Sequence, residues 1–142
     1  MENKEEYSAL FELGCADLKL VEKNLKDKEI REQILLFHLQ QAVEKFLKAL
    51  LSFQHIEFPK IHDIEELIEL CEESKIDLPS WAIELVKLTP YAVEFRYGFL
   101  IEEVLDINHY YGRVSELKEF VEKLISHKSR DTKERAEKSK KQ

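Results

Sequence analysis

The sequence predicts an all-α fold, an antiparallel up-and-down bundle of four to five helices. The chain of 142 residues contains only three Gly and three Pro, and it lacks the alternating runs rich in Val and Thr that are typical of strands. Its apolar residues recur instead at helical spacing over long stretches joined by short connections. A chain of this length forms one domain and can bury a core without disulfides or metals.

The most informative stretch is residues 34–53, ILLFHLQQAVEKFLKALLSF, which contains neither Gly nor Pro. At about 100° per residue its apolar side chains cover one broad face, which predicts a helix buried against several neighbours. A narrow polar stripe lies opposite, and Glu44 stands beside it. The members of the stripe are His38, Gln41, Lys45, Lys48 and Ser52. The stripe is either a binding site or a solvated face, and the pattern leaves both interpretations open.

A first helix is predicted from Glu5 to about Lys26, because apolar side chains recur along one face. Gly14 lies inside that face, where it costs roughly 1 kcal/mol of helix propensity relative to Ala. We therefore expect a neighbouring helix to approach closely at Gly14. A short turn at residues 27–29 leads to the second helix, which runs to about Gln54.

A third helix is predicted after a loop that contains Pro59. It opens at His62 and Asp63, and Asp63 is a suitable N-cap. Glu66 stands three residues after Asp63, which is the spacing of a capping box.

The second half of the chain begins with a break at residues 76–80 and a short helix that Ser80 is expected to cap and Pro90 to end. Residues 91–98, YAVEFRYG, alternate aromatic with other side chains, so a short extended segment and a new helix after Pro90 are both allowed. Residues 99–106 predict an irregular connection, and a last long helix covers about residues 107–127.

Charge is unevenly distributed along the chain, whose formal net charge is −7. Residues 127–142 contain seven Lys and Arg against three Asp and Glu and predict a disordered basic tail, either an electrostatic arm or a solubilising segment. The preceding domain, residues 1–126, carries fifteen basic and twenty-six acidic residues. Such a surface repels polyanions at long range, which disfavours broad nucleic-acid binding but leaves a local phosphate pocket open.

The sequence also indicates a cytoplasmic protein that does not enter the membrane. Cys15 and Cys71 lie far apart among apolar helical positions, and we interpret them as reduced core thiols. The first seven residues, MENKEEY, are largely charged, so a signal peptide is not expected. No apolar run approaches the roughly 20 residues that cross a bilayer.

Standard catalytic and cofactor patterns do not occur in the sequence. It contains no GxSxG, Walker or HExxH motif, and three glycines exclude a Gly-rich phosphate loop. The five histidines are scattered without ligand pairs three or four residues apart, so we expect neither a metal site nor a cofactor.

Residues 38–51, HLQQAVEKFLKALL, resemble the second-helix signature of the HEPN family. Three further features follow in the family's order: the loop containing Pro59, the helix start HDI at residues 62–64, and the pair RY at residues 96–97. The resemblance covers roughly residues 9–125. It implies a helical bundle that often forms a homodimer. Many prokaryotic members are encoded beside a minimal nucleotidyltransferase, as a two-gene module of toxin–antitoxin type.

Part of the HEPN family consists of metal-independent ribonucleases with an Arg-x(4–6)-His motif, in which Arg holds the scissile phosphate and His moves the proton of the 2′-hydroxyl. This sequence departs from the motif. Twelve residues separate Arg96 from the next histidine, His109. Arg31 and His38 have six residues between them, but they lie at the start of the second helix. The resemblance therefore favours a non-catalytic protein, with an endoribonuclease as the alternative.

The functional hypothesis that remains is a groove that binds the phosphates of a nucleotide or RNA at one end of the bundle. It would combine cations, a helix N-terminus and an aromatic face. Its candidate residues are Lys45, Lys48, His62, Arg96 and Tyr97.

A structural interpretation of the same region is equally open. Glu44 and Lys48 have the spacing of an i,i+4 ion pair, and Arg96 is a second possible partner of Glu44. His38 and Gln41 suit structural hydrogen bonds. We expect a HEPN-like protein that binds a nucleotide, a nucleotidyltransferase partner or both. A ribonuclease with Arg96 or Arg31 and His38 or His109, and a helical interaction module without a ligand, are the alternatives.

Overall fold

The computed structural model describes residues 2–94 and 105–140, with side chains from residue 6 to 92 and from 105 to 126. The described chain contains five α-helices, one 3₁₀ helix and no strand, which confirms the predicted all-α class. The elements are α1 (Glu2–Asn24), α2 (Glu32–Phe53), α3 (Ile64–Glu73), the 3₁₀ helix η1 (Ser80–Leu88), α4 (Pro90–Glu94) and α5 (Ile107–Lys140).

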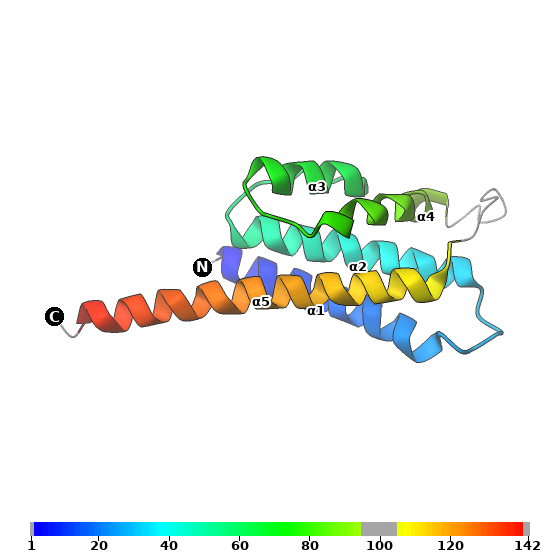
Figure 1. Cartoon of the computed structure of the whole chain (residues 1–142), viewed down its shortest axis with the longest axis horizontal. Coiled ribbons are helices and arrows are strands. Elements are labelled where there is room, and N and C mark those ends of the chain that lie inside the picture. Colours follow the sequence, from blue (N-terminus) through cyan, green and yellow to red (C-terminus); the bar gives the residue numbers. More distant parts are fainter. Residues whose placement is uncertain (1, 95–104, 141–142) are drawn as a thin grey trace.

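Helix α2 occupies the centre of the bundle (Figure 1). Helices α1 and α2 run antiparallel and α5 lies alongside them, whereas α3, η1 and α4 cover the other side of α2. Helix α2 contacts each of the other elements, and thirteen of its residues are buried. Because burying one Leu or Phe side chain is worth about 1.5–3 kcal/mol, α2 is the main source of hydrophobic stabilisation.

Several helix ends differ from those predicted. Pro79 holds the N-cap position of η1 and no side chain caps this helix, so the expected Ser80 cap is wrong. Pro90 begins α4, because its fixed φ suits the first position of a helix. The segment at residues 91–98 therefore starts as helix. Its later residues, including Arg96 and Tyr97, lie outside the described part of the chain.

Helix α5 continues to Lys140 instead of ending near residue 127, and its last part extends past the other helices (Figure 1). The segment that composition predicted to be disordered is thus helical up to Lys140. It contains no Gly or Pro, and its acidic residues, Asp131, Glu134 and Glu137, each precede a basic residue by four positions. This spacing supports an isolated helix through i,i+4 ion pairs. The division into a domain at residues 1–126 and a tail remains a prediction.

Both α2 and α3 end in Schellman motifs without glycine. The amide of Ile56 donates to the carbonyl of Leu51 and the amide of Ile76 to that of Cys71, each at 2.9 Å. The residue that turns the chain has a positive φ in each case, 61° at His55 and 64° at Lys75. The sharp turn at His55 reverses the chain after α2, so that residues 56–62 return toward the middle of that helix.

The two cysteines are free thiols. Burial raises the pKa of Cys71 to about 12. Burial also raises the pKa of Cys15, which is partly exposed on α1. Both side chains are therefore protonated near neutral pH and pack as small apolar groups.

Gly14 of α1 packs directly against a side chain of α2. A Cβ placed on Gly14 would lie 2.7 Å from Cε1 of Phe46, whose side chain is completely buried. The Phe46 ring of α2 thus occupies the space of the missing side chain, which explains the glycine through a close side-chain contact with the neighbouring helix.

We expect Gly14→Ala to lower the free energy of unfolding by about 1–2 kcal/mol, because overpacking a core costs more than the helix propensity gained. Gly112→Ala on α5 is the matched control, since a Cβ there meets no atom within 4 Å. This variant should be up to about 1 kcal/mol more stable than the wild type. Urea denaturation measures both changes, and a gain in stability for Gly14→Ala would contradict the close packing.

Candidate functional site

A buried carboxylate lies at the centre of the polar stripe. Glu44 of α2 is only 3% exposed. It accepts hydrogen bonds from Nζ of Lys48 at 3.2 Å and from the side-chain amide of Gln40, and it lies 3.0 Å from Nδ1 of His62. The amide of Gln41 extends the network by donating to Oε1 of Gln40 at 2.7 Å. Lys48, Gln40 and His62 thus contact the buried carboxylate directly, and Gln41 acts on it through Gln40.

Local sequence explains how these groups meet. Gln40, Glu44 and Lys48 are four residues apart on α2, so they lie along one side of the helix. His62 comes from the connection that precedes α3, and its carbonyl accepts from the Gln40 amide at 3.4 Å.

Asp63 fixes the start of α3 next to this network. It accepts a hydrogen bond from the amide of Glu65 at 3.0 Å and is the N-cap of α3, as expected. The bond goes to Glu65 and not to Glu66, so the side-chain bond differs from that of the capping box suggested by the spacing. The cap orders the residue that follows His62 and thereby helps to hold His62 against Glu44.

A second cluster on the same stripe joins α2 to α1. Asp17 of α1 accepts from Nζ of Lys45 at 2.5 Å and lies 3.0 Å from Nδ1 of His38. All three side chains are partly buried. Lys45 and Lys48 therefore face different carboxylates, one on α1 and one on α2.

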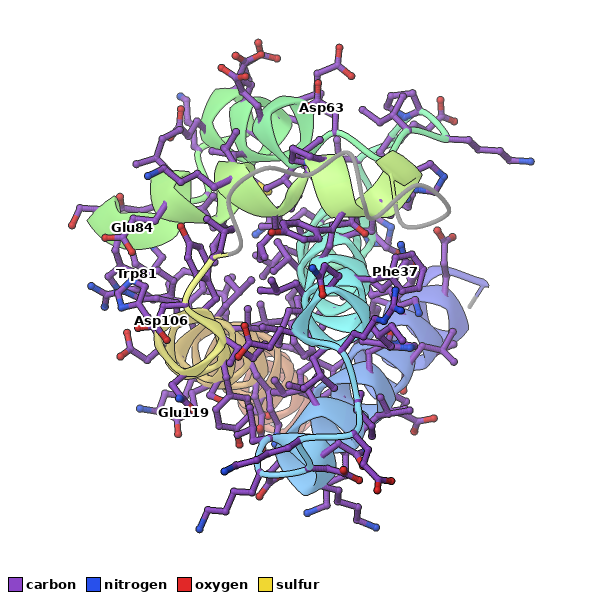
Figure 2. All side chains as sticks on the ribbon, turned by 90° about the vertical axis from the view of Figure 1, so that its right-hand side faces the viewer. Phe37, Asp63, Trp81, Glu84, Asp106 and Glu119 are labelled. Atoms are coloured by element: carbon purple, nitrogen blue, oxygen red, sulfur yellow. The ribbon has the colours of Figure 1, made fainter. Side chains whose placement is uncertain are left out.

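A third cluster lies between η1 and α5. Oε2 of Glu84 lies 3.0 Å from Nε2 of His109 and accepts from Nε of Arg113 at 3.2 Å. The guanidinium of Arg113 stands over the ring of Trp81, with 5.2 Å to its centroid. Figure 2 shows Trp81 and Glu84 beside the start of α5, near Asp106, and on the other side of α2 from Phe37. The hydrogen bond with His109, followed by the one from Arg113, lowers the pKa of Glu84.

One comparison with known proteins identifies the fold family. The HEPN domain model matches residues 7–138 of the chain. The chain belongs to the HEPN family. No curated protein and no solved structure matches this HEPN domain. In the part of the domain that the structure describes, no helix is both long and apolar enough to cross a membrane.

The HEPN domain brings together only some of the residues predicted to form a groove. Lys48 and His62 meet at Glu44, whereas Lys45 is bound to Asp17. The predicted i,i+4 pair of Glu44 and Lys48 is present. Arg96 and Tyr97 lie outside the described residues, so their place relative to Lys48 and His62 stays a prediction. Within the described ranges, no group of His, Cys, Asp or Glu is arranged to hold a metal ion.

Sequence reasoning missed two features of these clusters. Gln40 is completely buried although it is polar, and its spacing of four residues from Glu44 was the available signal. His109 and Arg113 are also four residues apart, which places both on one side of α5. Their partner Glu84 could not be identified from the sequence, because it is 25 residues away from His109.

We expect Lys48→Met to destabilise the HEPN domain by about 1–3 kcal/mol. This variant keeps the apolar stem but leaves buried Glu44 with fewer charged partners. Lys19→Met is the control, because Lys19 and Glu22 form an exposed pair with the i,i+3 spacing. Its effect should stay below about 1 kcal/mol. Chemical denaturation of both variants gives the comparison, and equal effects would mean that Glu44 does not depend on Lys48.

We expect the stabilisation by Glu84 to depend on pH. Because its pKa is lower in the folded protein, the unfolded chain binds protons more readily in this range. The stabilisation is complete above the ordinary Glu pKa of about 4.3 and is lost as the pH falls through the folded value. Melting temperatures should therefore separate wild type from Glu84→Gln at neutral pH and converge in acid. Glu119→Gln, at an exposed position on α5, is the control and should show no such convergence.

Proposed function

We propose that this HEPN domain is a non-catalytic binding protein that acts with a minimal nucleotidyltransferase in a two-gene module of toxin–antitoxin type. The observation that carries this proposal is the state of the cations on the polar stripe. Lys45 is bound to Asp17, and Lys48 and His62 are bound to Glu44. Lys45 and Lys48 are largely buried against these carboxylates, so a phosphate at either ammonium group would compete with an internal carboxylate, which supports a structural role for the stripe. His62 is 62% exposed and meets Glu44 through Nδ1 only.

Exposed apolar side chains on α1 support binding to another protein. Leu13 is 53% exposed and Leu20 is 41% exposed. They are seven residues apart, so they lie on one side of α1, with the exposed Ala16 between them. Apolar side chains grouped in this way favour a protein contact. We assign this stripe to the homodimer or to the nucleotidyltransferase, and we place the protein in the cytoplasm, where free thiols such as Cys15 and Cys71 persist.

Nucleotide binding is the second part of the proposal. With Lys45, Lys48 and His62 bound to carboxylates, Arg96 and Tyr97 become the main candidates for a phosphate and a base. In the sequence they come two and three residues after Glu94, the end of α4, which packs against α2 and η1.

A metal-independent endoribonuclease is the alternative function, and one observation favours it. His109 and Arg113 both reach a single oxygen of Glu84, at 3.0 and 3.2 Å. Two such side chains within reach of one oxygen could also meet one phosphate and its 2′-hydroxyl, with Arg holding charge and His moving a proton. Glu84 occupies that position in the folded chain.

Sedimentation of the chain alone and with the nucleotidyltransferase encoded nearest to it tests the proposal. We expect the chain to form a homodimer and to form a stable complex with the nucleotidyltransferase. Leu13→Glu should abolish one of these two assemblies, namely the one that uses the apolar stripe on α1. Ile83→Glu is the control, because Ile83 is also exposed but lies on η1. A monomer that forms no complex would contradict partner binding.

The same preparations separate nucleotide binding from RNA cleavage. We expect ATP or GTP to raise the melting temperature by several degrees at about 100 times the dissociation constant, and Arg96→Ala to abolish this shift. A short RNA should remain intact with the wild type. Cleavage that is lost in His109→Ala and altered in Glu84→Ala would instead establish the ribonuclease.

A further inference from the structure

A surface cavity of about 450 Å³ lies at the end of α2, and its lining contains no member of the three clusters described above. It is lined by Glu6 of α1, by Ser52 of α2 and by the connecting segment from His55 to Lys60. Figure 1 shows the start of α1 beside the end of α2, and a contact between the rings of Tyr7 and Phe53 fixes the two helices there. Its volume is in the usual range of small-molecule sites, about 300–1,000 Å³.

The wall of this cavity contains a buried hydroxyl without a partner. Ser52 is 4% exposed, and its Oγ has no hydrogen-bond partner in the described part of the chain. Such groups are rare in folded proteins, because a buried hydroxyl that makes no hydrogen bond is costly. The last turn of α2 therefore holds an unpaired polar group that can act as donor or acceptor. Its Oγ is closed to solvent, so a bound molecule reaches it only when the adjoining wall of the cavity shifts.

The charges around the cavity favour a cation. The C-terminal end of α2 is the negative end of its dipole, and its last turn contains no basic residue. Two carboxylates, Glu6 and Glu57, line the cavity against one ammonium group, that of Lys60, and His55 is the remaining ionisable side chain. A phosphate would meet both carboxylates and the helix end, so an anion is disfavoured here.

Phe58 adds an aromatic surface suited to the same ligand. Nζ of Lys48 already stands over its ring, with 5.8 Å to the centroid, so this ring interacts with a cation inside the protein. From the hydroxyl, the carboxylates, the helix end and the aromatic ring, we propose that the cavity binds a small organic cation with an ammonium or guanidinium group. This site is independent of the nucleotide and partner proposed above.

Isothermal titration of the full chain with spermidine and with agmatine tests this proposal, with glutarate as the anionic comparison and the ionic strength held constant. We expect both cations to bind and glutarate not to bind. Glu57→Gln should weaken binding by about tenfold, because it removes a charged hydrogen-bond partner. Ser52→Ala should weaken binding without lowering the melting temperature of the free protein, because the lost hydroxyl has no partner in the described chain.

Glu29→Gln is the matched control, since Glu29 is exposed in the connection before α2 and therefore at the other end of that helix. If Glu29→Gln and Glu57→Gln lower the affinity equally, the cations are attracted by the acidic surface in general and not by this cavity. That result would overturn the proposal. Preferential binding of glutarate, or no binding of either cation, would also overturn it. A peptide of residues 127–142 is a further probe. If it binds more tightly than spermidine and agmatine, and if Glu57→Gln weakens its binding to the same degree, the cavity still binds a cation, but the cation comes from the chain's own basic segment.

Discussion

The burial of most of α2 is the constraint on which the rest of the structure depends, because thirteen of its residues are buried and it contacts every other element. A polar side chain in the buried part of this helix is destabilising unless it finds a partner. Glu44 shows the consequence most directly, because a carboxylate that is 3% exposed is strongly destabilising unless it is paired. Lys48 comes from α2 itself, but His62 comes from outside, and its contact with Glu44 constrains where the chain must pass before α3 begins.

The same constraint explains why the stripe divides into two clusters. Lys45 and Lys48 lie about 60° apart around the helix axis, at about 100° per residue. Lys45 faces α1, where Asp17 meets it together with His38, whereas Lys48 faces the chain that leads to α3. Neighbouring cations in the sequence thus stabilise contacts between different pairs of elements, and a single groove formed by both does not arise from α2 alone.

The fold could be predicted because its signals are local. The apolar face of α2, the small residue at Gly14 and the cap at Asp63 all act on neighbouring residues or on the helix packed next to them. The site could not be predicted to the same depth, since Lys45 meets Asp17 across 28 positions and Arg113 meets Glu84 across 29. Many carboxylates in this acidic chain are possible ion-pair partners for each cation. Which of them forms the pair is determined by the packing of the helices. The end of α5 was missed for another reason. Composition indicates that a segment cannot build a core, but a sequence with opposite charges spaced four residues apart favours a helix without one.

The energies of the ion pairs also decide where an anion can bind among the described residues. A buried carboxylate that loses its partners is strongly destabilising, so a phosphate that displaced Glu44 from Lys48 and His62 would leave a buried charge without compensation. Exposed pairs contribute about 0–1 kcal/mol, and the carboxylate of Glu84 can turn into water at little cost. His109 and Arg113 would then present a proton donor and a guanidinium to an incoming phosphate, with Trp81 beside them. Among the described residues, the surface between η1 and α5 is therefore where a phosphate can replace a carboxylate as the partner of a cation at the lowest energetic cost. The residues that resemble the family signature lie elsewhere, on α2.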